Sequence, residues 1–300
     1  MAYPGIHAAT RPDHPAVVMV GSGETLTYRQ LDQRSNQVAH LLRSMGLGPG
    51  DHMALFMENQ IRFMEVVWGA LRSGVYVTAI NSFLSSEEVA YIIDDCDARL
   101  VVTSRAKAEV ATAVDPATTP DVERWLMTDG VPAADDSSGS AGPGWEPYED
   151  AIASFPDTPI PDEQPGFPML YSSGTTGRPK GVKRPLPEHT IDELEPRVAT
   201  FFVERYRYGP DMVYLSPAPL YHAAPMTFST AVTRVGGTLL VMERFDAESC
   251  LQAIEDHRVT HSQFVPTMFI RMLKLDDDRR LGPDLSSLEV AIHAAAPCPV

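Results

Sequence analysis

The chain has 300 residues, of which 44% are hydrophobic and 21% charged, with a formal net charge of −16. This composition is ordinary for a globular protein, so it excludes fibrous and wholly disordered classes. Such a negative surface disfavours nucleic acid and anionic lipid as partners, and a phosphate site must therefore be a local basic feature. A chain this long predicts two domains or one large one, and its core needs no disulfide or metal for stability.

Cysteine usage and apolar runs bear on the compartment. Cys96, Cys250 and Cys298 are far apart and form no CxxC pair, which argues against a disulfide framework and a zinc site. The N-terminus has no basic segment followed by an apolar core, and no apolar run approaches about 18 residues. We therefore expect a cytoplasmic protein with no signal peptide and no membrane span.

The first part of the chain alternates between strand-like and helix-like patterns. Residues 16–20 and 25–28 flank Gly21-Ser22-Gly23-Glu24 and predict a β-hairpin. Ser85 and Glu88 have the spacing of a capping box and predict the start of a helix. The other predicted strands are 52–57, 75–80 and 98–103, and the other predicted helices are 28–45 and 61–74. This alternation predicts βαβ units and a mainly parallel sheet.

Two changes of composition divide the rest of the chain. Residues 135–144 are rich in Gly and Ser and predict an exposed loop, whereas the five prolines of 155–168 predict a stiff crossing segment. We expect a first α/β subdomain over 1–155, a Pro-rich crossing segment over 156–168 and a second α/β subdomain over 169–300. The elements predicted after the crossing segment are strands near 167–172, 212–216, 238–243, 260–265 and 288–293, and helices near 197–207, 223–235, 246–257 and 266–274.

The chain stops where a predicted strand runs into a turn, at AIHAAAPCPV (291–300). Nothing follows that could cover the end of this strand, and natural α/β domains seldom leave a sheet open in this way. We therefore expect a truncated chain.

Residues 168–184, with the sequence PMLYSSGTTGRPKGVKR, carry the clearest chemical signal. An apolar strand leads into hydroxyl residues, glycines and a lysine: Ser172, Ser173, Gly174, Thr175, Thr176, Gly177 and Lys180. Backbone N–H groups freed by glycine, hydroxyl donors and a lysine charge are together typical of a cradle for phosphate oxygens. Arg178, Lys183 and Arg184 add positive charge. The segment is not a Walker A motif, because Lys180 is followed by Gly181 rather than Ser or Thr.

MLYSSGTTGRPK (169–180) resembles the AMP-binding signature of the adenylate-forming superfamily, which includes acyl-CoA synthetases, luciferases and peptide-synthetase adenylation domains. The resemblance extends from about residue 10 to the chain end. Other blocks that are similar to the family are 26–59, 71–102, PAPLYHAAPM (217–226), FVPTMF (264–269) and HAAAPCP (293–299). It implies the layered α/β fold, with mainly parallel sheets, of the large N-terminal domain of an AMP-forming acyl-CoA synthetase, here incomplete.

The resemblance also implies a reaction. A carboxylate attacks the α-phosphorus of ATP, pyrophosphate leaves, and the thiol of coenzyme A then displaces AMP from the acyl-adenylate. The loop from Ser172 to Lys180 would hold the outer phosphates with help from Mg²⁺. Lys180, Thr175 and His222 are the predicted catalytic residues, and His222 would orient the acyl carboxylate. Tyr221, Thr267 and Met268 would contact the substrate.

A turn near the end of the chain is the predicted adenine contact, through Ala295, Ala296 and Pro297. Relatives commonly have glycine where this chain has Ala294. The resemblance places three further elements after Val300: a segment that holds Mg²⁺, an aspartate for the ribose, and a catalytic lysine on a small C-terminal domain. We therefore expect the C-terminal domain to be absent from this chain, and the metal-binding residues are unknown.

Three interpretations stay open at this level. The first is a fatty or aryl acid–CoA ligase that acts on a hydrophobic carboxylic acid, with ATP and CoA as its other substrates. The second is an adenylation domain that loads a carrier protein, and the third is a truncated, non-catalytic nucleotide-binding module. A homodimer stays open as the assembly. The remaining histidines, His52 among them, show no ligand spacing and are predicted to be structural.

Overall fold

The computed structural model describes residues 3–132, 144–172, 179–193 and 198–297. By its internal contacts the chain divides into two compact units. Unit 1 comprises Met1–Leu31, Asn59–Ile61 and Asp192–Val300, and unit 2 comprises Asp32–Glu58 and Arg62–Ile191. The subdomain limits 1–155 and 169–300 stay a prediction. Contacts group the chain differently, because the N-terminal hairpin pairs with strands of unit 1 and the strand after the Pro-rich segment pairs within unit 2.

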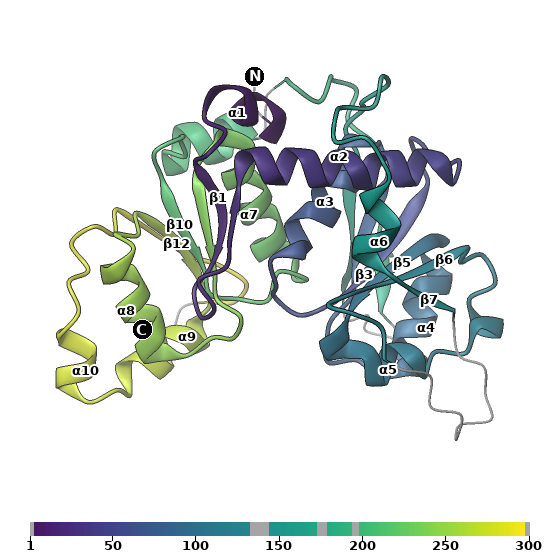
Figure 1. Ribbon diagram of the computed structural model, residues 1–300. Coiled ribbons are helices and arrows are strands. Elements are labelled where there is room, and N and C mark those ends of the chain that lie inside the picture. The colour runs from purple at the N-terminus through teal and green to yellow at the C-terminus, as the bar shows by residue number, and fades with distance from the viewer. Residues whose placement is uncertain (1–2, 133–143, 173–178, 194–197, 298–300) are drawn as a thin grey trace. The chain divides into compact units, whose positions relative to one another are not determined.

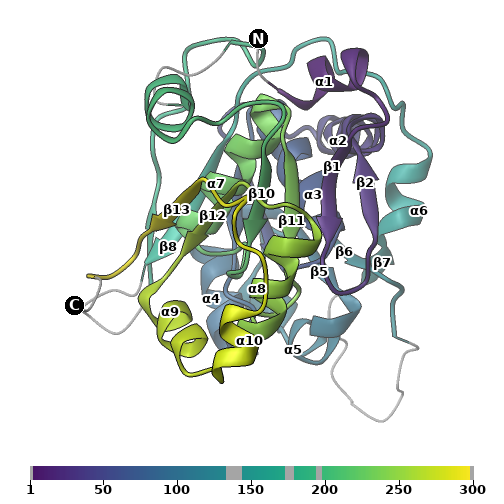
Figure 2. The ribbon, with the colours of Figure 1, turned by 90° about the vertical axis from the view of Figure 1, so that its left-hand side faces the viewer.

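Unit 1 contains a six-stranded sheet in the order β13-β12-β10-β11-β1-β2, most of it parallel (Figure 2). Its strands are β1 (Pro15–Met19), β2 (Thr25–Thr27), β10 (Val213–Ser216), β11 (Thr238–Val241), β12 (His261–Phe264) and β13 (Val290–His293). The antiparallel pair β1–β2 confirms the predicted hairpin, and β1 then pairs in parallel with β11. The distant ends of the chain thus share one sheet.

The helices of unit 1 are fixed by apolar packing and by turn chemistry. They are α1 (Pro4–Thr10), the π-helical η3 (Val198–Arg205), α7 (Ala223–Val235), α8 (Ala247–Asp256), α9 (Pro266–Leu273) and α10 (Asp277–Leu281). Helix α7 packs against β10 and β11 and ends at Gly236, whose φ of 94° favours glycine. Buried residues of α8 and α9 form a core cluster with strand residues such as Leu215 and Phe264.

Unit 2 contains a seven-stranded sheet in the order β7-β6-β5-β3-β4-β8-β9, parallel except for the last pair. Its strands are β3 (His52–Phe56), β4 (Tyr76–Ala79), β5 (Ala98–Ser104), β6 (Arg124–Thr128), β7 (Trp145–Pro147), β8 (Phe167–Ser172) and β9 (Lys180–Val182). The predictions had omitted β6, β7 and β9. Strands β3 and β4 are buried throughout, as expected when helices cover both faces of a parallel sheet.

Along the chain, the helices of unit 2 are interspersed with its strands (Figure 1). They are α2 (Tyr28–Ser44), whose first residues belong to unit 1, α3 (Arg62–Arg72), α4 (Ser86–Asp95), α5 (Ala108–Thr112) and α6 (Tyr148–Ala153), with 3₁₀ turns at Arg105–Lys107 and Pro116–Thr118. The predicted capping box is present: the Ser85 hydroxyl accepts from the Glu88 N–H, and Glu88 accepts from the Ser85 N–H. Buried residues of α4 pack on β3, β4 and β5. The fold is therefore the expected α/β fold with mainly parallel sheets.

A buried ionic cluster joins three helices of unit 2. The Glu65 carboxylate of α3 is fully buried and lies 2.6 Å from Nε of Arg34 on α2 and 3.0 Å from Nη1 of Arg62. Glu149 of α6 pairs with both arginines. Since an unpaired carboxylate would be strongly disfavoured at this depth, the two guanidinium groups are what allow Glu65 to be charged there.

The Pro-rich segment is held along α2 and α3. Asn36 donates to the Asp157 carbonyl at 2.9 Å, Arg43 pairs with Asp162 at 3.1 Å, and the Gly166 N–H donates to the Leu71 carbonyl at 2.6 Å. Gly166 directly precedes β8, and an added Cβ there would lie 2.3 Å from the Val75 carbonyl oxygen. This close backbone contact sets where β8 begins.

We predict that Gly166→Ala lowers the free energy of unfolding by about 1–3 kcal/mol, because the new methyl group overlaps backbone atoms that cannot rotate away. Gly144→Ala is the matched control in the same unit, since a Cβ at Gly144 meets no atom of the described residues within 4 Å. That control should change stability by less than about 0.5 kcal/mol. Urea unfolding of both variants measures this, and equal effects would show that the contact at Gly166 does not constrain β8.

Candidate functional site

The signature segment lies on an antiparallel hairpin at the edge of the unit 2 sheet. Strand β8 pairs with β4 in parallel and with β9 in antiparallel fashion, and Ser172 is the register partner of Lys180. Lys180 is exposed at the start of β9. Of the predicted phosphate-binding residues, the structure describes Lys180 and the backbone of Ser172, whereas Ser173, Gly174, Thr175, Thr176 and Gly177 lie outside the described residues. The hairpin brings the two ends of the signature loop together.

Lys180 and Lys183, two basic residues in and after the signature that the structure describes, do not lie together. Lys180 begins β9 and Lys183 directly follows it, so the two residues are about 10 Å apart at the usual strand rise. The Lys183 ammonium lies 2.8 Å from Nε2 of His52 and 4.7 Å from the centre of the Tyr76 ring. The strand therefore carries Lys183 away from the loop, whereas Arg178 lies outside the described residues.

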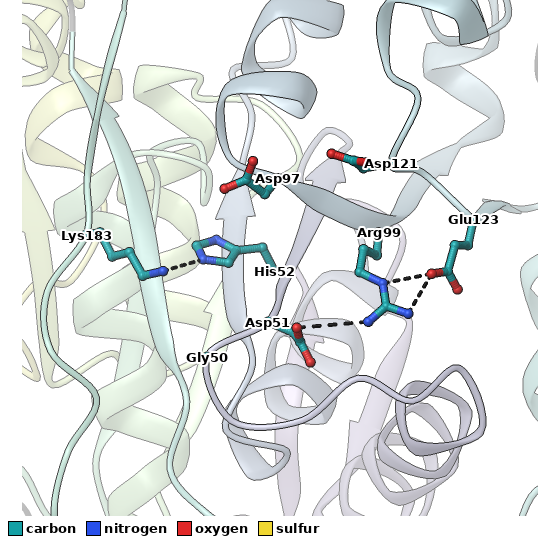
Figure 3. Close-up of a pocket in the computed structure, with 8 residues that line it drawn as sticks. All are labelled: Gly50, Asp51, His52, Asp97, Arg99, Asp121, Glu123 and Lys183. Carbon is teal, nitrogen blue, oxygen red and sulfur yellow. Dashed lines mark hydrogen bonds and ion pairs between the residues drawn. The ribbon is translucent and has the colours of Figure 1, made fainter.

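Lys183 borders a polar pocket of about 400 Å³ at the amino ends of the parallel strands of unit 2 (Figure 3). Its lining residues are Gly50, Asp51, His52, Asp97, Arg99, Asp121, Glu123 and Lys183. Arg99 pairs with Glu123 at 2.5 Å and with Asp51 at 3.9 Å. Since Ser172 ends a strand parallel to β4 and His52 begins β3, the pocket lies at the sheet edge opposite the signature loop. It is not part of a phosphate cradle.

His52 is buried and stacks on Tyr76, with ring centroids 4.8 Å apart. Burial, and then the charge of Lys183, lower the pKa of His52 below its ordinary value. The ring is thus neutral near pH 7, which lets Nε2 accept a hydrogen bond from the Lys183 ammonium. The structural role predicted for His52 has this geometric basis.

In unit 1 the predicted substrate and adenine residues follow three neighbouring strands. Tyr221 and His222 come after β10, Thr267 and Met268 after β12, and Ala295 after β13. These strands are parallel neighbours, with Leu215 opposite Ser262 and Phe264 opposite His293. Their carboxyl ends share one edge of the sheet, which is where open α/β sheets bind ligands.

His222 immediately precedes α7, and its ring lies 4.4 Å from that of Tyr221. Tyr221 is buried, whereas His222 reaches solvent. Neighbouring atoms remove part of the water around the His222 ring, and this desolvation lowers its pKa below the ordinary value. Near neutral pH the ring is therefore an uncharged imidazole, which donates one hydrogen bond and accepts another.

The other predicted contacts of unit 1 differ in exposure. Thr267 is exposed in the first turn of α9, but Met268 is buried in the cluster that joins α8 to the sheet. Ala295, Ala296 and Pro297 are exposed, and Ala295 has a φ of 75°. A left-handed backbone costs a residue other than glycine about 1–2 kcal/mol. The strained position is thus Ala295, next to the Ala294 that replaces glycine.

Sequence reasoning did not single out Asn59, which fixes the turn that carries Tyr221 and His222. Its buried side chain donates to the carbonyls of Ala218 at 3.1 Å and Met242 at 2.8 Å. It also accepts from the Leu220 N–H at 2.7 Å. Three backbone groups from two turns are satisfied by this one amide. Nothing in the local pattern around Asn59 points to partners that lie more than 150 residues away in the sequence.

Two kinds of feature are not found among the described residues. No group of three or more His, Cys, Asp or Glu side chains there has the arrangement of a metal site. None of the helices in those same ranges is both long and apolar enough to cross a membrane.

Residues 6–300 match the family described as AMP-binding enzyme, and the chain belongs to that family. It is 28% identical over 291 residues to the fatty acid–[acyl-carrier-protein] ligase ScoC of Streptomyces coeruleorubidus, with 97% of this chain and 52% of that protein covered. It is also 28% identical to the long-chain-fatty-acid–CoA ligase FadD13 of Mycobacterium tuberculosis, with 97% and 54% covered. The chain thus spans about half the length of the curated relatives it matches. The resemblance read from the signature is confirmed.

Solved structures share the fold. The N-terminal domain of FACL13 from Mycobacterium tuberculosis, determined with an inhibitor, superposes with a TM-score of 0.77 at 25% identity, covering 100% of this chain and 71% of that one. The anthranilate CoA ligase AuaEII, determined with anthranoyl-AMP, gives a TM-score of 0.80 at 21% identity and covers 99% and 54%.

We predict that Asn59→Ala lowers the free energy of unfolding by more than about 2 kcal/mol, because it leaves three buried backbone groups without a partner. Asn81→Ala is the control, since Asn81 accepts a single local hydrogen bond from the Phe83 N–H in an exposed turn. Thermal and chemical unfolding report the difference. A loss no greater than that of the control would contradict the role given to Asn59.

Protonation of His52 should make stability depend on pH. Because its pKa is lower in the folded chain, the unfolded chain binds more protons just below the ordinary pKa of about 6.5. The contribution of neutral His52 to the free energy of unfolding is therefore complete above that pH and is lost as the pH falls below it. His7, His14, His222 and His261 have lowered pKa values as well, so the wild type should lose stability through several groups.

His52→Gln isolates one contribution, because glutamine can still accept from Lys183 but does not titrate. We expect urea unfolding between pH 7.5 and 5.5 to show a shallower loss of stability in this variant than in the wild type. The difference in slope cannot exceed about 1.4 kcal/mol per pH unit. Identical slopes would mean that His52 has the same pKa in the folded and unfolded chain.

Proposed function

We propose that the protein carrying this chain activates a hydrophobic carboxylic acid with ATP and transfers the acyl group to the thiol of coenzyme A. The observation that carries this proposal is the signature segment itself. All its positions from Met169 to Lys180 fit the family pattern, and its ends are paired at a sheet edge with Lys180 exposed.

In the first half-reaction, a carboxylate oxygen attacks the α-phosphorus and pyrophosphate leaves. This step needs positioning and charge stabilisation more than covalent chemistry by the protein. The Lys180 ammonium would bind the outer phosphates, with hydroxyl and backbone donors of Ser172, Ser173, Gly174, Thr175, Thr176 and Gly177. In the second half-reaction, the thiol sulfur attacks the acyl carbon, and AMP leaves with the oxygen that came from the carboxylate.

His222 would orient the acyl carboxylate. Its neutral ring can donate a hydrogen bond to a carboxylate oxygen without forming a permanent ion pair that would hold the nucleophile back. It also precedes α7, whose first turn has no acidic residue, so the positive end of the helix dipole favours an anion there. Adenine contact by Ala295, Ala296 and Pro297 is proposed on the resemblance and on their exposure at the same sheet edge.

Mg²⁺ would neutralise phosphate charge when bound. The described residues contain no cluster of three or more His, Cys, Asp or Glu side chains that could hold it.

The substrate is proposed to be uncharged beyond its carboxylate. The turn around Tyr221 is apolar, and an aromatic cluster lies on η3 and α7, where the exposed Phe201 ring is 5.1 Å from Phe202 and 6.4 Å from Phe228. Aliphatic and aromatic acids both suit such surroundings. Matches to a long-chain-fatty-acid–CoA ligase and to 4-coumarate–CoA ligase 3 of Oryza sativa subsp. japonica, 28% identical, support the same range.

A carrier protein is the second candidate for the acceptor, because one relative of similar identity is named an acyl-carrier-protein ligase. Both acceptors present a thiol, and the first half-reaction is the same for both. To test the choice, either coenzyme A or a phosphopantetheinylated carrier protein is added to the enzyme-bound acyl-adenylate, and the rate of acyl transfer to each thiol is measured. Faster transfer to the carrier protein would replace coenzyme A in this proposal.

The protein should exchange labelled pyrophosphate into ATP only when a hydrophobic carboxylic acid is present.

Lys180→Ala should weaken ATP binding about ten- to a hundredfold and AMP binding much less, since the lost charge-assisted contact is worth about 1.5–3 kcal/mol and involves the outer phosphates. Arg29→Ala, at an exposed surface pair with Asp13, is the control for loss of a positive charge. Stronger exchange with an amino acid would overturn the substrate class, and equal weakening for both nucleotides would overturn the role of Lys180.

A further inference from the structure

Side chains of helix α4 contact both ends of the signature loop. Before the loop, the Tyr171 hydroxyl of β8 donates to Oδ2 of Asp95 at 2.5 Å. After it, the Tyr91 hydroxyl lies 3.2 Å from the Pro179 carbonyl oxygen. Tyr91 also lies 3.3 Å from Oδ1 of Asp95, one helical turn away on α4. Two phenols and one carboxylate thus link the two strands of the hairpin through a single helix.

The protonation states suit these contacts. Burial, and then the hydrogen bond to Asp95, raise the pKa of Tyr171 above its ordinary value, so the phenol keeps the proton that it donates. The single Tyr91 proton is shared between Asp95 and the Pro179 carbonyl, which are nearly equidistant. A carboxylate that accepts from phenols forms stronger hydrogen bonds than a neutral acceptor does.

Helix α4 is itself held firmly. Its first turn is closed by the capping box of Ser85 and Glu88, and its apolar face packs into the core of unit 2. The residues of that face include Val89, Ile92 and Ile93, each almost completely buried. Side chains presented by a fixed helix can hold a neighbouring segment with little loss of precision.

We propose that Tyr91 and Asp95 are positioning residues for phosphate binding: they hold Tyr171 and Pro179 so that Lys180 meets the outer phosphates of ATP. The inference rests on the proposed function. Pro179 directly precedes Lys180, so a displaced Pro179 carbonyl moves the lysine as well. Neither positioning residue is expected to touch the nucleotide.

A purely structural role would lower stability and leave substrate binding unchanged. Asp95 is exposed and Tyr91 is half-buried, so removal of one hydroxyl or one carboxylate charge should change the melting temperature little. The Michaelis constant for ATP should respond instead. The Michaelis constant for the carboxylic acid should not, because the acyl contacts are assigned to residues of unit 1.

The experiment compares Tyr91→Phe and Asp95→Asn with Asp94→Asn in the full protein. Asp94 is the neighbouring exposed carboxylate of α4, and among the described residues its side chain has no hydrogen-bond partner. We expect the two test variants to raise KM for ATP about three- to tenfold, with KM for the acid and Tm unchanged. The control should match the wild type in all three quantities. Unchanged KM for ATP in both test variants would overturn the positioning role.

A second measurement separates this inference from the proposed function. Amide hydrogen exchange of the peptide 171–183 should accelerate in both test variants and not in Asp94→Asn, whether or not the protein is active. A wild type that exchanges no pyrophosphate would overturn the proposed function. Unchanged amide exchange would overturn the statement that Tyr91 and Asp95 hold the hairpin.

Discussion

Backbone pairing between β8 and β9 places Ser172 opposite Lys180, and every residue proposed to bind the outer phosphates lies on or between these two partners. The pairing has consequences in both directions along the hairpin. Towards the loop it brings an exposed lysine to the carboxyl edge of a parallel sheet, where ligands of α/β folds bind. Away from the loop it carries Lys183 to the opposite edge, where the neutral His52 ring accepts a hydrogen bond from the ammonium group, which also lies 4.7 Å from the centre of the Tyr76 ring. One short edge strand therefore separates an exposed lysine, Lys180, from Lys183, which pairs with His52.

The unit 1 residues depend on a different constraint, which is the satisfaction of buried backbone groups. The turn with Tyr221 and His222 leaves a strand end and passes over buried backbone, where unpaired N–H and C=O groups are costly. Asn59 supplies the missing partners for Leu220, Ala218 and Met242. The orientation of His222 thus follows from a residue that contacts no proposed ligand. After β13, Ala295 has a left-handed backbone conformation, which is costly for a residue other than glycine. It lies at the place proposed for adenine.

Local patterns predicted the elements whose information is local. The capping box at Ser85, the hairpin of β1 and β2 and the helix α7 with its terminal glycine follow from residues within a few positions of one another. The signature loop was also readable from the sequence, since glycines, hydroxyls and a lysine are contiguous. Strand β9 was missed because three residues after a loop carry no periodicity, and only their partner in β8 makes them a strand.

Long-range pairing could not be read from local patterns. Nothing around Pro15–Met19 indicates a partner at Thr238–Val241, so the assignment of the N-terminal hairpin to the sheet of unit 1 required the structure. The same holds for Asn59, for the contact between Lys183 and His52, and for the link from Tyr91 and Asp95 to the signature loop. Each joins groups that are far apart in the sequence, and their proximity is set by the fold and not by the sequence near either residue.

The central claim is that a carboxylate attacks the α-phosphorus of ATP at this site. Isotope transfer tests it most directly. The protein is incubated with ATP, coenzyme A and a hydrophobic acid that carries ¹⁸O in its carboxylate. The masses of AMP, pyrophosphate and inorganic phosphate are then measured by mass spectrometry. The account predicts AMP that contains a single ¹⁸O atom, because the bridging oxygen of the acyl-adenylate leaves with AMP, and unlabelled pyrophosphate. Label in inorganic phosphate would show attack at the terminal phosphorus, and AMP without label would show that no acyl-adenylate forms.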